Sequence, residues 1–455
     1  MGEKERCPDL GPSETARLNP RDVHRALEPH VLVDGYDLVL DFSASSGTWL
    51  VDAVTGKRYL DLFSFFASAP LGINPPCIAD DPEFMRELAA AAVNKPSNPD
   101  LYSVPYARFV QTFARVLGDP RLPHLFFVDG GALAVENALK AALDWKAQKL
   151  GLDEQAVDGL HVMHLERSFH GRSGYTMSLT NTEPSKTARY PKFGWPRIPS
   201  PALRHPLSQY AGANEAAERH AVEAAEKMFL AADGMIACFV AEPIQGEGGD
   251  NHLSAEFLQA MERLCHEHDA LFVLDEVQSG CGITGTAWAY QQLGLRPDLV
   301  AFGKKTQVCG VMGGGRIDEV PENVFTVSSR ISSTWGGNLT DMVRATRILE
   351  TIERTELFDT VVRRGAYFRD ALEALEAEYP ETVSNARGRG LMCAVDLPDP
   401  GLRDDVLGRM YRDHLVIALP CGERGLRFRP ALTITESEID QAIEALARSV
   451  EALTA

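Results

Sequence analysis

A carboxylate and a pair of lysines stand at the ends of two apolar segments and could share one reaction centre. Asp275 ends the run LFVLD, and Lys304 and Lys305 follow the run LVAFG. A buried charge without a partner is costly, so these groups need either a partner or a function. The roughly 30 residues between Asp275 and Lys304 match one strand–helix–strand unit, which would bring both groups to one edge of a sheet. For Asp275 taken alone, a purely structural partner such as an arginine stays open.

A glycine turn and two further side chains could complete a cofactor site. Gly130, Gly131 and Ala132 lie between an apolar strand and a helix, where backbone N–H groups can hold an anion, although a tight turn without a ligand has the same pattern. The segment FHGRSG adds Phe169, which could lie on a flat ring, and Arg172, whose guanidinium suits a carboxylate. Pyridoxal 5'-phosphate needs a lysine for its Schiff base, a carboxylate beside its pyridine nitrogen and a phosphate cradle. Taken together, these residues predict that cofactor.

The motifs resemble those of a known enzyme family. From about residue 30 to 450 the chain is similar to the class III pyridoxal-phosphate-dependent aminotransferases, through FVDGGALAVENALK, FHGRSG, AEPIQGEGG, VLDEVQSG, AFGKK, STWGGN and RGLRFRPALT. The resemblance implies the fold-type I architecture and a homodimer whose subunits share their active sites. Within the family, the doubled lysine and STWGGN look most like the branch that moves the ε-amino group of L-lysine to 2-oxoglutarate.

The resemblance also implies the cofactor contacts, position by position. Gly131 and Ala132 match the phosphate-binding turn, and Phe169 matches the aromatic that stacks on the ring. Gln278 matches the residue near the phenolic oxygen, and Thr334 matches the threonine that reaches the phosphate from the other subunit. No metal ion is implied.

The doubled lysine needs a choice between its two members. In relatives with adjacent lysines the first forms the Schiff base, which points to Lys304, with Lys305 as the alternative. Asp275 matches the carboxylate that keeps the pyridine nitrogen protonated. The chain departs from the family at Cys309-Gly310, where most members have Gly-Gly, so the shape of this loop stays open.

The two substrates of such an enzyme make opposite demands on one pocket. Lysine has no carboxylate near its reacting carbon, whereas 2-oxoglutarate has one directly attached. The resemblance implies that Glu247 and Arg427 form a salt bridge that closes for lysine and opens for 2-oxoglutarate, when Arg427 takes the α-carboxylate. Arg172 would hold the far carboxylate in both half reactions. A surface ion pair is the alternative for Arg427, Arg429 could be confused with it, and we expect His170 only to shape its loop.

Other functions fit parts of the pattern. An ornithine or 4-aminobutyrate aminotransferase would differ mainly in pocket depth, which one sequence does not rank. An aminomutase or decarboxylase on the same fold would need neither the Glu247–Arg427 switch nor a keto acid. A catalytically inactive binding protein would not need Lys304 and Asp275 together, and a nucleotide-binding Rossmann protein would show GxGxxG after an early strand.

The elements that must position these residues alternate strand and helix from about residue 124 to 305. This pattern predicts an α/β fold with a mostly parallel central sheet and helices on both faces. In such sheets the ligand crevice lies beyond the carboxyl ends of the strands. The clearest strands are expected at 125–128, 160–165, 235–241, 270–274 and 299–302.

The two ends of the chain have a different pattern. Residues 31–75 alternate like antiparallel hairpins, and 339–378 read as one long helical stretch. We expect a large cofactor-binding domain over 76–340 and a smaller α+β domain built from 1–75 and 341–455. The last third should add strands at 390–396, 416–419 and 426–429 and a helix after Thr435.

Composition limits the partners of the protein. Its 64 acidic and 45 basic residues give a net charge of −19, which disfavours nucleic acid. No apolar run approaches the ~20 residues of a membrane span, and the polar start does not resemble a signal peptide, so we expect a cytoplasmic protein. The eight cysteines, Cys7 to Cys421, form no CxxC pair and are expected to be reduced rather than bridged or zinc-bound.

Overall fold

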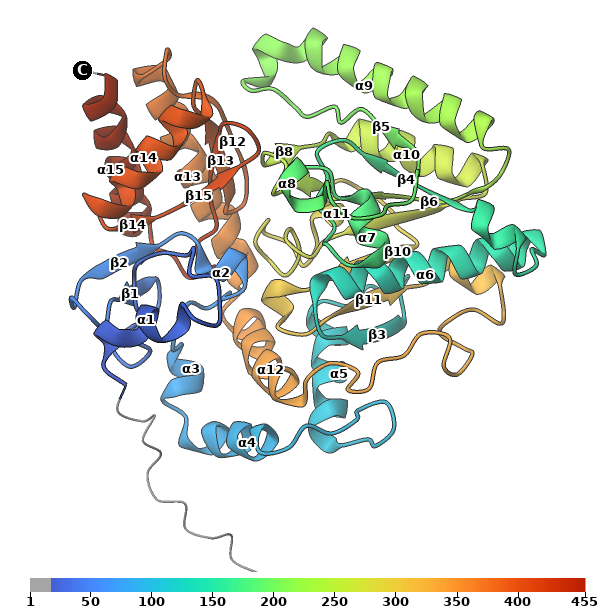
Figure 1. Ribbon diagram of the computed structural model, residues 1–455, viewed down its shortest axis with the longest axis horizontal. Coiled ribbons are helices and arrows are strands. Elements are labelled where there is room, and N and C mark those ends of the chain that lie inside the picture. Colours follow the sequence, from blue (N-terminus) through green and yellow to red (C-terminus); the bar gives the residue numbers. More distant parts are fainter. Residues whose placement is uncertain (1–17, 455) are drawn as a thin grey trace, which may run out of the picture.

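The computed structural model describes residues 18–454 and is built around a seven-stranded sheet (Figure 1). The strand order is β3-β11-β10-β9-β6-β4-β5. Neighbouring strands pair in parallel, except that β11 is antiparallel to both β10 and β3. The bounds are β3 His124–Val128, β4 His161–Leu165, β5 Arg197–Ile198, β6 Ile236–Ala241, β9 Leu271–Asp275, β10 Leu299–Phe302 and β11 Cys309–Gly313.

The five strands expected from the sequence are all present, each within one residue of its predicted ends. Strand β11 was not predicted, because two of its five residues are glycine and its sequence, CGVMG, has no alternating pattern. It is a strand because β3 and β10 hydrogen-bond to it from both sides, and such tertiary pairing outweighs local propensity.

Helices cover both faces of this sheet (Figure 1). Because successive side chains in a strand point to opposite faces, Val240 and Val273 pack in the cluster under α6, whereas Phe239 and Phe272 pack in the cluster that includes α10. The helix bounds are α1 Val23–Leu27, α2 Ser64–Ala67, α3 Pro76–Ala79, α4 Pro82–Ala92, α5 Val104–Val116, α6 Gly131–Leu150, α7 Gly174–Leu179, α8 Pro184–Thr187, α9 Leu207–Ala231, α10 Ala255–Glu267, α11 Ala289–Gln292, α12 Leu339–Arg354, α13 Leu357–Glu378, α14 Pro400–Arg412 and α15 Glu436–Thr454.

The N- and C-terminal parts of the chain share a small sheet. Strand β14 runs parallel to β2, with Val416 opposite Leu60, so the two segments pack together as expected. A four-stranded antiparallel sheet, β12-β13-β16-β15, follows in the last third. The domain boundaries themselves stay a prediction. The remaining bounds are β1 Trp49–Val51, β2 Arg58–Asp61, β7 Ile244–Gln245, β8 Asn251–His252, β12 Ser384–Arg389, β13 Met392–Asp396, β14 Val416–Ile417, β15 Leu419–Cys421 and β16 Gly425–Phe428.

The single helical stretch expected over 339–378 is wrong, because two helices occupy it. Helix α12 ends at Arg354 and α13 begins at Leu357. Between them Glu356 has a φ of 49°, in the left-handed region, which no α-helix continues through. Neither glycine nor proline marks this break in the sequence.

Three further features bear on the expected partners. Over residues 18–454, no helix is long and apolar enough to cross a membrane. In the same part of the chain no group of three or more potential metal ligands comes together. Seven cysteines are described, and all are free; Cys7 lies outside the described residues.

Candidate active site

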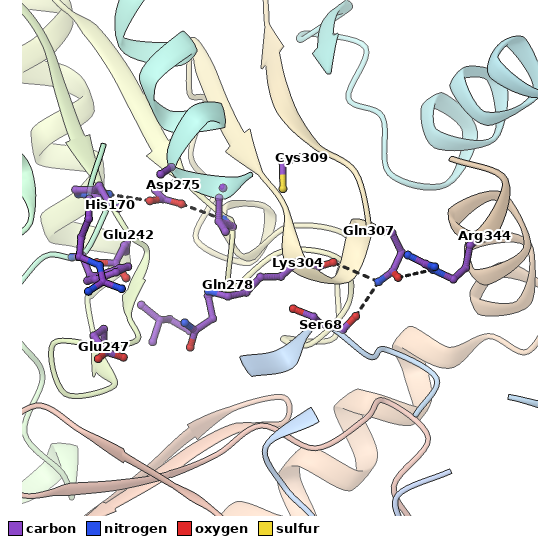
Figure 2. Close-up of a pocket in the computed structure, with 17 residues that line it drawn as sticks. Ser68, His170, Glu242, Glu247, Asp275, Gln278, Lys304, Gln307, Cys309 and Arg344 are labelled. Atoms are coloured by element: carbon purple, nitrogen blue, oxygen red, sulfur yellow. Dashed lines mark hydrogen bonds and ion pairs between the residues drawn. The ribbon is translucent and has the colours of Figure 1, made fainter. Parts of the chain in front are cut away.

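Loops at the carboxyl ends of the parallel strands surround a cavity of about 600 Å³ (Figure 2). The lining comes from loops that follow β4, β6, β9 and β10, from the start of α6, and from Ser68 and Arg344 of the terminal segments. The cavity brings together most of the residues singled out in the sequence. These are Gly131, Ala132, Phe169, Arg172, Glu247, Asp275, Gln278 and Lys304.

The glycine turn forms the start of α6, as the sequence predicts. Gly130 has a φ of 109°, a conformation that side chains rarely tolerate, and the helix begins at the next residue. A Cβ on Gly131 would lie 2.9 Å from Cγ1 of Val277, so this turn packs closely against the loop after β9. The first N–H groups of a helix have no partner within it, and here they belong to a long helix whose first residues line the cavity.

Asp275 is the last residue of β9 and is held from two sides. Its Oδ1 accepts a hydrogen bond from the Val277 N–H at 3.0 Å, and its Oδ2 lies 2.8 Å from Nδ1 of His170, which therefore donates. Burial alone would lower the pKa of His170, but the hydrogen bond and charge of Asp275 outweigh it and raise the pKa above its ordinary value. His170 thus does more than shape its loop, which the sequence reasoning missed.

The two adjacent lysines have different surroundings. Nζ of Lys305 donates to the backbone carbonyl of Gln278 at 2.6 Å, and burial lowers the pKa of this lysine to about 7. Lys304 lines the cavity, and within residues 18–454 its amine has no hydrogen bond or ion pair. Burial lowers the pKa of Lys304 as well, with the charge of Asp275 opposing it only in part. Of these two lysines, Lys304 is therefore the one that offers a free, weakly basic amine to a ligand.

Hydrogen bonds of the Gln307 side chain hold the loop that carries Lys304. Lys304 itself has a φ of 54°, an uncommon conformation for a residue with a side chain. Nε2 of Gln307 donates to the carbonyls of Ser68 at 2.7 Å and Lys304 at 3.3 Å, and its Oε1 accepts from Nε of Arg344 at 2.9 Å (Figure 2). Gln307, Ser68 and Arg344 were not predicted, because their contacts join distant parts of the chain.

Gln278 is oriented by a buried ion pair. Nε of Arg429 donates to its Oε1 at 2.9 Å, and Arg429 is itself paired with Asp250 in a site closed to solvent. Because a guanidinium has only donors, the amide oxygen must face Arg429, which leaves the amide NH₂ of Gln278 to donate elsewhere. The pairing with Asp250 also distinguishes Arg429 from Arg427, with which it could be confused in the sequence.

Arg427 pairs with Glu247, as the resemblance implied. Its Nη2 donates to Oε2 of Glu247 at 2.6 Å. Arg172 is exposed at the cavity and makes no hydrogen bond or ion pair within the described residues. Thr334 is exposed outside the cavity of its own chain, in the loop that precedes α12.

Comparison with known proteins identifies the family. A family model for class-III aminotransferases matches residues 33–450, and the chain belongs to that family. An L-lysine-epsilon aminotransferase of Streptomyces clavuligerus is 81% identical over 453 residues, which are 100% of this chain and 99% of that protein. A solved structure of the lysine aminotransferase of M. tuberculosis in the internal aldimine form has a TM-score of 0.92 and 58% identity, over 96% of this chain and 100% of that chain. A 4-aminobutyrate aminotransferase of Saccharomyces cerevisiae is 31% identical over 91% of this chain and 90% of its own length.

The predicted family and fold-type I architecture are thereby confirmed, and pyridoxal 5'-phosphate is the cofactor. The cavity fits this group on its own evidence. It contains a lysine amine without a partner, a carboxylate fixed at a strand end, and a helix start that is close-packed around glycine. A primary amine, an anion for the pyridine nitrogen and N–H groups for a phosphate are the contacts that the cofactor needs.

Proposed function

We propose that this enzyme moves the ε-amino group of L-lysine to 2-oxoglutarate by ping-pong transamination. In the first half reaction lysine leaves as 2-aminoadipate 6-semialdehyde, which cyclises to piperideine-6-carboxylate. In the second, 2-oxoglutarate leaves as L-glutamate. The observation that carries the choice of lysine is the 81% identity to an L-lysine-epsilon aminotransferase along the whole chain, against 31% to a 4-aminobutyrate aminotransferase.

Lys304 is proposed as the residue that holds the cofactor covalently and then moves the proton at the reacting carbon. When bound, pyridoxal 5'-phosphate supplies the electron sink for this chemistry. The lowered pKa of Lys304 favours the neutral amine, which can take a proton and return it. Lys305 is a poor alternative, because its amine is already bonded to the Gln278 carbonyl.

The other residues of the cavity would hold the cofactor in place. Asp275, fixed by His170, would face the pyridine nitrogen, and the amide of Gln278 would donate to the phenolic oxygen. The helix start at Gly131 and Ala132 would take the phosphate, and Phe169 would cover the ring.

Glu247 and Arg427 would let one pocket accept both substrates. In their ion pair the charge of Arg427 is matched by Glu247, which would suit lysine, because lysine has no carboxylate near the reacting carbon. Opening the pair would free Arg427 for the α-carboxylate of 2-oxoglutarate, while Arg172 holds the distal carboxylate in both half reactions. A decarboxylase or aminomutase would have no use for this alternation.

We also propose a homodimer that completes the site with Thr334. An apolar surface lies beside this residue: Leu101, Tyr102 and Val104 are 70%, 83% and 81% exposed. Asn98, at the start of the same segment, donates through Nδ2 to the Trp335 carbonyl at 3.0 Å, so this segment and the Thr334 loop are in direct contact. A second copy that covers this surface would bring Thr334 to the neighbouring cofactor. Sedimentation at micromolar concentration should give twice the chain mass.

The cytoplasmic location likewise remains a proposal. Its support is that the described cysteines are unpaired, as expected in a reducing compartment.

A panel of amine donors tests the function. The purified holoenzyme is incubated with 2-oxoglutarate and with lysine, ornithine or 4-aminobutyrate, and glutamate is measured. We expect lysine to have the highest kcat/KM, and no turnover without a keto acid. A preference for ornithine or 4-aminobutyrate would overturn the choice of donor, and turnover without a keto acid would overturn transamination.

A further inference from the structure

Glu247 contacts two cations, one through each carboxylate oxygen. Its Oε2 accepts from Nη2 of Arg427 at 2.6 Å, and its Oε1 accepts from Nζ of Lys186 at 2.5 Å. Lys186 was not singled out in the sequence. It belongs to the short helix α8, far along the chain from both partners.

The backbone around Glu247 leaves little room for movement. A Cβ on Gly248 would lie 1.8 Å from the carbonyl oxygen of Arg167, so this loop is packed backbone against backbone. The carbonyl of Glu247 also accepts from the N–H of Gly422 at 2.9 Å. Any change of partner must therefore come from rotation of side chains rather than from movement of this loop. Because Lys186 and Arg427 use different oxygens, the carboxylate can turn away from one cation while it keeps the other.

The two cations differ in their freedom. The Arg427 side chain is 2% exposed, and its Nη1 lies 3.5 Å from Oε1 of Gln278, so it is enclosed next to two residues that line the cavity, Glu247 and Gln278. The Lys186 side chain is 17% exposed and lies between Glu247 and the exposed Glu183, 3.0 Å away. It also borders a second cavity of about 570 Å³, shared with Arg172. A lysine has a flexible stem and a compact charge, so it can follow a moving carboxylate.

We propose that Lys186 is a positioning residue for the acceptor half reaction, because it keeps the Glu247 carboxylate paired while Arg427 binds the keto acid. This inference rests on the proposed function. Without Lys186, a mostly buried carboxylate would lose its only charged partner whenever the pair opened, and an unpaired buried charge is costly. With Lys186, one charged contact to Glu247 persists in both positions.

The charge of Glu247 fits this role. Burial alone would raise the pKa of the Glu247 carboxyl, but Arg427 and Lys186 outweigh burial and lower the pKa below its ordinary value. Both cations contribute, so the carboxylate stays ionised near neutral pH.

Rapid mixing of the holoenzyme with one substrate at a time separates the two half reactions. In Lys186→Met we expect the apparent Kd for 2-oxoglutarate to rise about 10-fold, while the rate with lysine stays within about 2-fold, because only the acceptor step opens the pair. Lys186→Arg keeps the charge and should recover most of the affinity. Lys227→Met, an exposed lysine on α9, is the matched control and should behave as wild type.

Two outcomes would overturn the role of Lys186: an unchanged Kd for 2-oxoglutarate in Lys186→Met, or an equal loss in both half reactions. A wild-type enzyme that does not react with lysine would instead overturn the proposed donor. The effect of Lys186→Met on 2-oxoglutarate could then still be measured, after conversion of the cofactor by another amine.

Discussion

Two carboxylates on one loop of the active site, Glu242 and Glu247, are held in opposite ways. Glu242 is buried and accepts from the backbone N–H groups of Phe169 at 2.8 Å and Gly246 at 3.1 Å. The carboxylate of Glu247 is bound by two cationic side chains, and within the described chain no backbone N–H donates to it. Backbone donors cannot turn away, whereas side chains can rotate.

The contrast extends to the two ends of the cavity. The end at Asp275 is fixed by a strand, a backbone N–H and a buried histidine. The end at Glu247 is fixed in its backbone, and its carboxylate is held by side chains that we propose can exchange. A fixed end suits a cofactor that stays in place through the whole cycle, and an exchangeable end suits two substrates of different charge.

Removing the charge of Asp275 should have the largest effect. Asp275→Asn keeps the shape of the side chain but leaves His170 without its charged partner and the pyridine nitrogen without an anion. We expect kcat/KM to fall on the order of 10²–10³-fold in both half reactions. Glu276→Gln is the matched control, because the neighbouring Glu276 bonds to Ser279 and Tyr290 and does not line the cavity. Similar activities in the two variants would contradict the proposal that Asp275 holds the cofactor in place.

Neutralising Glu247 should affect only one half reaction. In Glu247→Gln, Arg427 loses its charged partner and stays available to a carboxylate. The reaction with lysine should slow about 10-fold, while the apparent affinity for 2-oxoglutarate is kept or improved. Glu183→Gln, which removes the other partner of Lys186, is the control and should leave both reactions near wild type. An equal loss in both half reactions would mean that Glu247 does not distinguish the substrates.

The pH dependence of stability should differ in sign between the two glutamates. Burial raises the pKa of Glu242 from 4.5 to about 7. Between these two pH values the folded protein holds a proton that the unfolded chain has released, so Glu242 lowers the stability of the protein as pH rises from 4.5 to about 7. The lowered pKa of Glu247 has the opposite effect: its contribution is present above 4.5 and is lost as pH falls below it.

Urea unfolding of the two variants at several pH values measures this difference. Relative to wild type, Glu242→Gln should gain more free energy of unfolding at about pH 8 than at about pH 5. Glu247→Gln should lose more at about pH 6 than at about pH 3. If the change in unfolding free energy relative to wild type had the same pH dependence in both variants, the surroundings of Glu242 and Glu247 would not differ as described.

The sequence predicted the residues of the cavity that lie directly after strands. Asp275 and Lys304 follow apolar runs whose ends a single sequence reveals, and the glycine turn precedes a long helical pattern. Local chemistry was enough in these cases, because each residue stands out within its own segment.

The residues alone did not predict contacts that join distant segments, and the Glu247–Arg427 pair was implied only by the family resemblance. Within its own segment, nothing distinguishes Lys186 from an ordinary surface lysine. Gln307 bonds to Ser68, which lies far from it in the sequence. His170 belongs to the motif FHGRSG, but only the fold brings its ring to Asp275. The same applies to β11, which is a strand only because it has neighbours. Side-chain pairing across a fold has no signature in one sequence.

The most direct test of the account is to find which lysine carries the cofactor. The protein is saturated with pyridoxal 5'-phosphate, reduced with borohydride, digested and mapped by mass spectrometry. We predict a phosphopyridoxyl group on Lys304 and none on Lys305, because the Lys304 amine is free in the cavity, whereas the Lys305 amine is bonded to the Gln278 carbonyl. A modification on Lys305, or on neither lysine, would contradict the account.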